Sequence, residues 1–151
     1  MSVAPTLGVY KLPTIDNEPM RNYEPNSKDR QELQKAVDEL LACNPFEIPV
    51  IIDGQEFRSG KLAKQVNPGD HAQAVCYYHE ADERMVNIAI EGALKAKKQW
   101  MNMPWSERAA ISMKAADLIA HKYRYQLLAA TMVGQGKNVW QAEIDAGAEI
   151  C

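Results

Sequence analysis

A chain of 151 residues is long enough for one domain with its own hydrophobic core. Its 17 Lys and Arg against 20 Asp and Glu give a net charge of −3, so neither nucleic acid nor an anionic membrane surface is expected as a partner. The three widely spaced cysteines resemble neither a disulfide framework nor a zinc site, and no apolar run approaches the ~18 residues needed to span a membrane.

Residues 1–27 are predicted to form an extended N-terminal arm. Four prolines interrupt this stretch, and it shows little hydrophobic periodicity. Among its first twenty residues, Lys11 is the only basic one, and there is no apolar signal-peptide core. The arm therefore carries no clear presequence.

A helix is predicted from Lys28 to about Ala42. Ser27 precedes it and is a suitable N-cap, because its hydroxyl can accept a hydrogen bond from a free backbone N–H. The Asn44-Pro45 pair would end the helix. The apolar residues that recur at helical spacing within it are Leu33, Val37, Leu40 and Leu41.

Residues 48–79 are predicted to form a small antiparallel β unit. Asp53-Gly54 separates two short β-rich runs, and this dipeptide favours a two-residue hairpin because both turn positions require positive φ. A second turn at residues 67–70 leads into residues 72–78, where the side chains alternate as in a strand.

The chain after Asp82 is predicted to be helical. Asp82 is the expected N-cap of a helix that runs to about Met101, and Pro104 breaks the pattern. Ser106 is expected to cap the next helix. The residues expected to face inward are Val86, Ile90, Ala93, Lys97 and Trp100 in the first helix, and Ile111, Ala115, Leu118 and Ile119 in the second.

The segment Gly134-Gln135-Gly136 separates two further helical runs. It matches neither GxxxxGK[ST] nor GxGxxG, and a helix rather than a strand precedes it. A left-handed glycine at a helix end is therefore favoured over a phosphate-binding loop. The last helix is expected to begin at about Asn138.

Histidines and cysteines give no catalytic or metal prediction. His71, His79 and His121 lack the spacing of metal ligands. No basic residue adjoins any of the cysteines in a way that would activate a thiol, so small buried side chains are expected at these positions. The cysteines are Cys43, Cys76 and Cys151.

The last helical run carries Glu143, Asp145 and Glu149 among small residues. Asp145 and Glu149 lie four apart and would share a helix face, and no Lys or Arg follows Lys137. Such carboxylates either pair with a cation from elsewhere in the fold or face a site that receives one. The helical pattern stops at Cys151 without a terminating residue, as expected for a chain cut inside a helix.

Two longer blocks resemble the aldehyde dehydrogenase superfamily. VNPGDHAQAV and ALKAKKQWMNMPWSERAAISMKAADLI follow one another in the order of that family. The resemblance implies an α/β parent fold, of which this chain would be a mostly helical piece with the small antiparallel β unit at 48–79. Residues 28–151 would then form an incomplete N-terminal portion of the NAD-binding domain.

Further blocks are similar to one branch of that family. NEPMRNYEPNSKDRQELQKAV, IPVIIDGQEF and ATMVGQGKNVWQAEIDAGAE resemble enzymes that oxidise glutamate semialdehyde to glutamate with NAD in proline breakdown. The resemblance implies a homo-oligomer in the mitochondrial matrix and a small-molecule aldehyde substrate. Glu149 would bind the substrate near its ammonium group.

The same resemblance places the nucleophile, the general base and the main NAD-binding segments beyond this part of the chain. No catalytic, cofactor-binding or metal residue is therefore expected here, and the chain alone should be inactive. Two alternatives stay open. The chain could be a non-catalytic interaction module that docks on complete subunits through unsatisfied helix faces, or part of an enzyme for a different aldehyde.

Overall fold

The computed structural model describes residues 14, 16–43 and 45–151, so most of the first half of the predicted arm, and Asn44, lie outside it. The described elements follow in the order α1 (Lys28–Ala42), β1 (Phe46–Ile48), β2 (Val50–Ile52), β3 (Gln55–Phe57), β4 (Leu62–Asn67), β5 (Asp70–His79), α2 (Glu83–Asn102), α3 (Trp105–Asp117), the π-helical η1 (Leu118–Lys122), α4 (Arg124–Gln135), α5 (Val139–Ala142) and the π-helical η2 (Glu143–Ala148).

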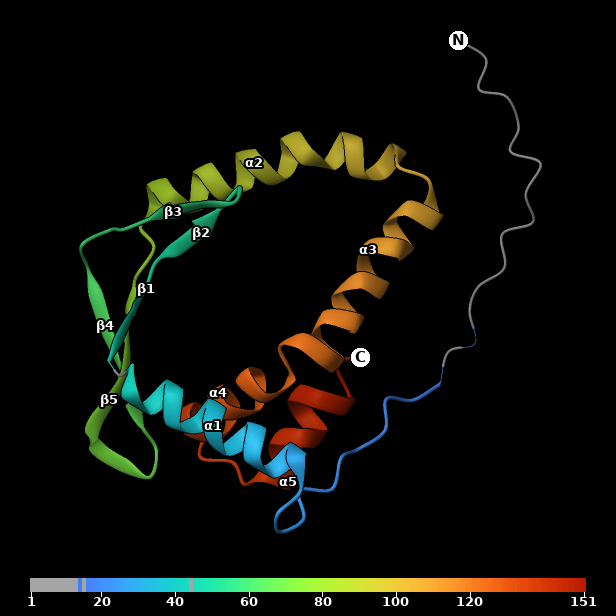
Figure 1. Ribbon diagram of the computed structural model, residues 1–151. Coiled ribbons are helices and arrows are strands. Elements are labelled where there is room, and N and C mark those ends of the chain that lie inside the picture. Colours follow the sequence, from blue (N-terminus) through green and yellow to red (C-terminus); the bar gives the residue numbers. More distant parts are fainter. Residues whose placement is uncertain (1–13, 15, 44) are drawn as a thin grey trace.

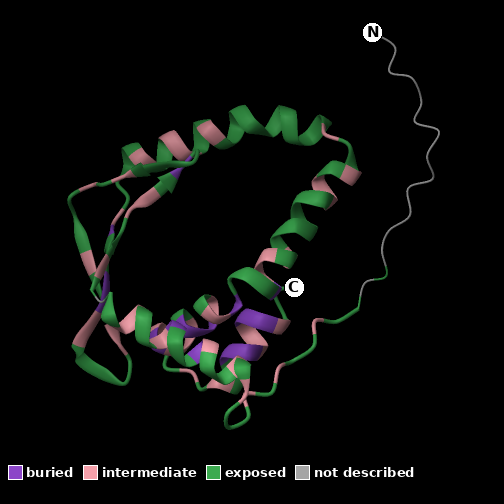
Figure 2. Ribbon diagram, in the orientation of Figure 1, coloured by how far each residue is buried: buried purple, intermediate pink, exposed green. Residues whose placement is uncertain are grey.

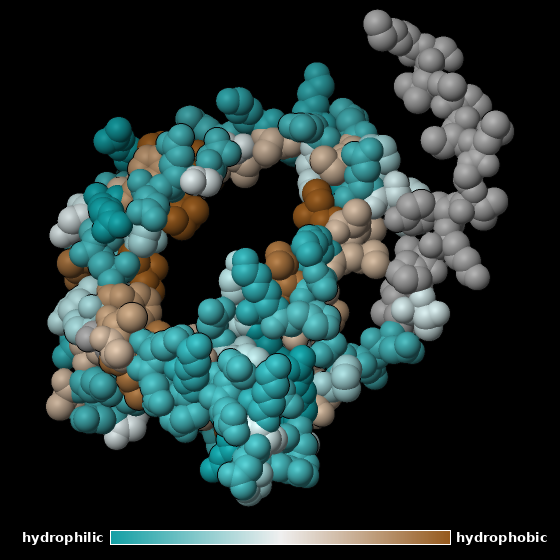
Figure 3. Space-filling model, in the orientation of Figure 1, coloured by the Kyte–Doolittle hydropathy of each residue, from teal (hydrophilic) through white to brown (hydrophobic). Residues whose placement is uncertain are grey.

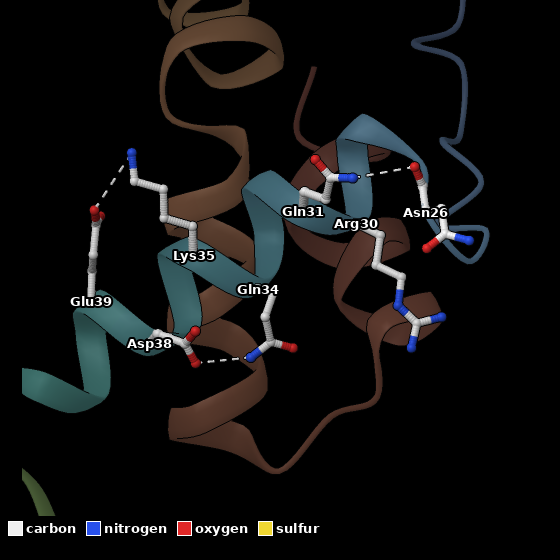
Figure 4. Close-up of a pocket in the computed structure, with 7 residues that line it drawn as sticks. All are labelled: Asn26, Arg30, Gln31, Gln34, Lys35, Asp38 and Glu39. Atoms are coloured by element: carbon white, nitrogen blue, oxygen red, sulfur yellow. Dashed lines mark hydrogen bonds and ion pairs between the residues drawn. The ribbon is translucent and has the colours of Figure 1, made fainter.

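Helix α1 has the predicted boundaries and the predicted cap. The Ser27 hydroxyl accepts a hydrogen bond of 3.2 Å from the backbone N–H of Arg30. Leu33 is buried on the inner face. Figure 4 shows the outer face, where polar side chains pair with one another along the helix in a shallow groove. These pairs are Gln34 with Asp38 and Lys35 with Glu39.

The strands form two small sheets. β2 and β3 make the predicted antiparallel hairpin, with φ of 51° at Asp53 and 73° at Gly54. β4 and β5 are also antiparallel, which confirms the second predicted pairing. β1 was not predicted. A three-residue strand carries too little pattern to be recognised from the sequence. β1 pairs in parallel with β5, which gives the strand order β1-β5-β4.

Helices α2 and α3 extend away from the other helices (Figure 1). The Asp82 carboxylate caps α2, as predicted, by accepting from the Met85 N–H at 2.8 Å. The cap predicted at Ser106 is wrong, because α3 already begins at Trp105 and Pro104 occupies the N-cap position. Pro fits the start of a helix, where its missing N–H is not needed.

The apolar stripes of α2 and α3 are mostly solvent-exposed. Neither helix contains a buried residue, so the prediction that these stripes face inward is wrong for the described chain. Ile90 and Ile111 are each 52% exposed, and Ala115 is exposed too. The physical reason is that, within the described chain, α2 packs mainly against β2, and little else covers either helix (Figure 2).

The hydrophobic core lies where α1 packs on α4 and on the C-terminal helical turns. Its buried members are Leu33, Leu128, Ala142 and Ala146. The small residues on α5 and η2 allow these turns to approach α4 closely. No helix of the described residues is long and apolar enough to cross a membrane.

Candidate functional site

A buried ion pair joins the start of α4 to the start of η2. The side chains of Arg124 and Glu143 are both 0% exposed. Arg124 donates from Nη2 to Glu143 Oε1 and from Nε to Oε2, the latter at 3.4 Å. A buried charge is tolerated only when it is paired and hydrogen-bonded, so each side chain requires the other.

The N-terminal arm completes this cluster. The backbone N–H of Arg21 donates to Glu143 Oε1 at 2.8 Å, and the Tyr23 hydroxyl donates to Oε2 at 2.6 Å. On the other side, Glu18 accepts from Arg124 Nη1 at 2.5 Å. The arm therefore supplies hydrogen-bond partners to both charges and closes the cluster from outside.

A second set of bonds ties the arm to α1 and α4. Arg21 Nη1 lies 3.0 Å from Asp29 Oδ1, and the Tyr125 hydroxyl donates to the same oxygen at 2.5 Å. The hydrogen bond from Tyr125, together with that from Arg21, lowers the pKa of Asp29. Arg21 thus contacts both clusters and fixes the path of the arm.

Charge and burial act against each other on Glu143. Burial favours the neutral acid, but the hydrogen bonds from Arg124 and Tyr23 prevail and lower the pKa of Glu143 below its ordinary value. Burial, followed by the bond to Glu143, raises the pKa of the Tyr23 hydroxyl. Near neutral pH, Glu143 is therefore a carboxylate and Tyr23 a neutral donor.

Gly147 lies against this ion pair. A Cβ at this position would come within 3.0 Å of Glu143 Oε2 and 3.3 Å of Arg124 Nη2. Any larger residue would push the ion pair or the η2 backbone aside. The absence of a side chain here is what allows η2 to cover the pair.

The carboxylates singled out from the sequence have different surroundings. Asp145 forms an ion pair with Lys137, the residue that precedes the last helical region. Glu149 is exposed directly after η2, and its backbone N–H donates to the Ile144 carbonyl at 2.9 Å. Among the described residues, no ion pair or hydrogen bond engages the Glu149 side chain. The two carboxylates are thus not brought together into one site.

Glu143 is the buried carboxylate that the sequence reasoning did not single out. Its signal was present in the small residues beside it, Ala142, Ala146 and Gly147, which mark a closely packed helix surface. The π-helical turns also differ from the assumed α-helix, since bonds span five residues rather than four. Helical spacing alone therefore pointed to Asp145 and Glu149 and not to Glu143, the carboxylate that is buried in an ion pair.

The cysteines and histidines form no reactive cluster among the described residues. Cys76 is buried as predicted, but Cys43 and Cys151 are exposed, which contradicts the prediction for both. Burial raises the pKa of the Cys76 thiol, so this group is not activated. No group of three or more potential metal ligands occurs in the described part of the chain.

His79 has a structural role instead. Its Nδ1 accepts from the Gly60 N–H at 3.2 Å, and its Nε2 lies 2.9 Å from Glu47. Because Nδ1 is an acceptor, the ring proton of the neutral form lies on Nε2 and faces the carboxylate. The contact joins β1, β5 and the loop before β4.

The glycine segment ends a helix, as predicted. Gly136 is the left-handed C-cap of α4, with φ of 67°, and Asn138 then starts α5 with a capping box to Gln141. This is not the strand-to-helix loop that holds a dinucleotide phosphate.

Comparison of the sequence with known protein families gives the class to which this chain belongs. The sequence model of the aldehyde dehydrogenase family matches residues 55–150, and the chain belongs to that family. The implied α/β parent fold, with a mostly helical piece and a small β unit in this chain, is also confirmed.

Individual relatives within the family are similar to this chain over most of its length. The chain is 54% identical to the delta-1-pyrroline-5-carboxylate dehydrogenase of Agaricus bisporus, over 95% of this chain and 26% of the relative. It is 41% identical to the human mitochondrial enzyme of the same name, over 90% of this chain and 24% of the relative. The chain thus spans about a quarter of the length of these curated relatives.

A solved structure follows the same backbone path. The delta-pyrroline-5-carboxylate dehydrogenase from Mycobacterium tuberculosis, bound with NAD, is similar with a TM-score of 0.90 and 36% identity. The match covers 95% of this chain and 27% of that one. The arrangement of helices and strands seen here therefore also occurs within a much longer subunit.

Proposed function

We propose that this chain is part of an NAD-dependent dehydrogenase that oxidises L-glutamate 5-semialdehyde, formed from 1-pyrroline-5-carboxylate, to L-glutamate in proline catabolism. The observation that carries the proposal is the 54% identity to the Agaricus bisporus relative over 95% of this chain. NAD would accept the hydride from the aldehyde carbon. A different aldehyde is the alternative substrate.

The proposal extends to the assembly and its location. Residues 28–151 form the N-terminal portion of the NAD-binding domain, and residues 1–27 form an arm whose described part contacts α1, α4 and η2. The complete enzyme is a homo-oligomer of the mitochondrial matrix. The location draws support from relatives in Emericella nidulans, mouse and human that are named mitochondrial.

Glu149 is the substrate-binding residue of the proposal. Its exposed carboxylate follows η2 directly, and the buried Arg124–Glu143 pair fixes the start of η2. Glutamate semialdehyde carries an ammonium group, and a carboxylate that lacks an internal partner can accept hydrogen bonds from it. The role of this chain is thus to hold and orient the substrate, while no covalent step is assigned to it.

The isolated 151-residue chain is expected to be inactive. Cys76 is buried with a raised thiol pKa, and partial desolvation raises the pKa of the Cys151 thiol, so neither is an activated nucleophile. The measurement is NADH absorbance with purified chain, NAD and pyrroline-5-carboxylate. NADH formation above the rate without protein would contradict this part of the proposal.

Replacement of Glu149 tests the substrate contact. The test uses a fusion protein, in which this chain is followed by the part of the Agaricus bisporus relative that lies C-terminal to the region matched by this chain. We expect Glu149→Gln to raise KM for glutamate semialdehyde by roughly 10-fold, because one charge-assisted contact to the ammonium is lost. KM for propanal, which has no ammonium group, should stay unchanged.

The matched control is Glu107→Gln, which removes another exposed carboxylate, in the first turn of α3. It should change neither KM. Equal effects of Glu149→Gln on both aldehydes would show a structural role for Glu149 and contradict the contact. Propanal oxidised as efficiently as glutamate semialdehyde by the unmodified fusion would favour the alternative substrate.

A further inference from the structure

The Glu143 side chain contacts η2 near both of its ends. Glu143 is the first residue of η2, and a Cβ on Gly147 would lie 3.0 Å from its Oε2. Two residues after Gly147, the backbone N–H of Glu149 donates to the Ile144 carbonyl at 2.9 Å. The last turn of η2 therefore follows the placement of the Glu143 carboxylate, and the backbone that carries the Glu149 side chain follows that turn.

Tyr23 of the arm binds the carboxylate oxygen that faces Gly147. Its hydroxyl donates to Glu143 Oε2 at 2.6 Å, whereas Arg124 Nε lies 3.4 Å from the same oxygen. The Nη2 of Arg124 donates to the other oxygen, Oε1. Burial and the neighbouring carboxylate raise the pKa of Tyr23, so its hydroxyl stays a donor near neutral pH. Tyr23 thus fixes the position of Oε2.

The described part of the arm is held largely by polar contacts. The space-filling view shows mostly hydrophilic side chains over the arm and α1 (Figure 3). Beside Tyr23, the Arg21 N–H donates to Glu143 and the Arg21 guanidinium donates to Asp29. Because individual hydrogen bonds place this segment, the loss of one of them is expected to loosen the groups that it joins.

We infer that Tyr23 is a positioning residue for Glu149. By binding Glu143 Oε2, it holds the last turn of η2 in the orientation in which the Glu149 carboxylate meets the substrate ammonium. The inference rests on the proposed substrate contact of Glu149 and adds the arm to the site. The π-helical form of η2 agrees with such a role, because these rare turns occur frequently at functional sites.

A purely structural role for Tyr23 predicts a different outcome. The hydroxyl would then only satisfy the buried Glu143 carboxylate, and its loss would lower stability and affect every aldehyde alike. The positioning role predicts an effect only on a substrate that carries an ammonium group. It also predicts that the effect requires the Glu149 carboxylate.

Tyr23→Phe in the fusion tests the inference by kinetics. The variant removes one hydroxyl and keeps the ring. KM for glutamate semialdehyde should rise by about 3-fold, less than after the loss of the Glu149 charge itself, and KM for propanal should stay unchanged. In the Glu149→Gln background, Tyr23→Phe should cause no further rise, because the charge that it positions is already absent.

The matched control is Tyr125→Phe. It removes the same atom from a tyrosine that also holds the arm but bonds Asp29 instead of Glu143. Both KM values should stay unchanged. A rise as large as that caused by Tyr23→Phe would show a general effect of arm attachment and overturn the inference. Equal effects of Tyr23→Phe on both aldehydes, or a further rise of about 3-fold in the Glu149→Gln background, would also overturn it.

Amide hydrogen exchange of the 151-residue chain distinguishes failure of this inference from failure of the substrate contact. Tyr23→Phe should accelerate exchange of the Glu149 amide by about 10-fold. The Val86 amide, which donates to the Asp82 carbonyl at 3.0 Å at the start of α2, should keep its rate. An unchanged rate at Glu149, or equal acceleration at both amides, would overturn the inference.

One combination of results separates the two proposals. Acceleration at the Glu149 amide alone, together with a Glu149→Gln fusion whose KM values for both aldehydes are unchanged, would support the positioning of Glu149 by Tyr23. The same combination would contradict the proposed contact between Glu149 and the substrate ammonium.

Discussion

Replacement of Arg124 by methionine is expected to lower the free energy of unfolding by about 3–5 kcal/mol, because it leaves Glu143 buried without its main partner. Methionine keeps much of the side-chain volume, so the loss reports the charge rather than a cavity. Tyr23 and the Arg21 N–H still donate to Glu143, but neither supplies a positive charge. Urea denaturation followed by circular dichroism measures the change.

A double variant separates the loss of the ion pair itself from the cost of leaving one charge buried without a partner. Arg124→Met combined with Glu143→Leu should cost less than the sum of the single changes, because no isolated charge remains inside. The control is Lys114→Met, which breaks an exposed ion pair with Asp117 and should change stability little. Additive losses in the double variant would contradict the proposed coupling.

The pH dependence of the same variants gives an independent readout. The pKa of Glu143 is lower in the folded state than its ordinary value of 4.5. The ionised Glu143 therefore contributes its full stabilisation at a pH above the ordinary pKa. This contribution is lost as the pH falls through the lowered pKa of the folded state. The wild-type chain should lose stability in this acidic range, and the Arg124→Met/Glu143→Leu variant should lose less.

Leu128→Ala is expected to lower the free energy of unfolding by about 2–5 kcal/mol, the range for truncation of a fully buried leucine. Leu128 is 0% exposed and packs in the core with Leu33 of α1 and Ala142 of α5. Its truncation leaves a cavity between α1 and α4 that rigid helices close only in part. Urea denaturation again measures the loss.

Leu94→Ala is the matched control, because it removes the same atoms from a side chain that is 62% exposed. In the isolated chain it should have little effect, since alanine also favours helix. Similar losses for the two variants would show that the hydrophobic core is not centred on Leu128.

The elements that depend on neighbouring residues could be predicted from the sequence. Ser27 and Asp82 cap helices because a hydroxyl or carboxylate reaches N–H groups within the next turn. Asp53-Gly54 turns because both residues tolerate positive φ, and Gly136 ends α4 for the same reason. The cap predicted at Ser106 was wrong because Pro104 occupies the N-cap position and α3 begins at Trp105.

Contacts between distant segments could not be predicted in this way. Nothing near Glu143 indicates that Arg124 and the arm residue Tyr23 will surround it, and the exposed position of the α2 stripe depends on what else packs there. The family was recognisable from the sequence because ordered blocks of residues suffice for it.

Local hydrogen bonding and turn conformation depend on short stretches of the chain, so the sequence by itself determined the bounds of α1, the start of α2, the end of α4, the β2–β3 turn and the family. Burial depends on which segments meet in space. Only the tertiary structure could therefore decide that Glu143 is the buried carboxylate, that Asp145 is paired, and that Glu149 stays exposed.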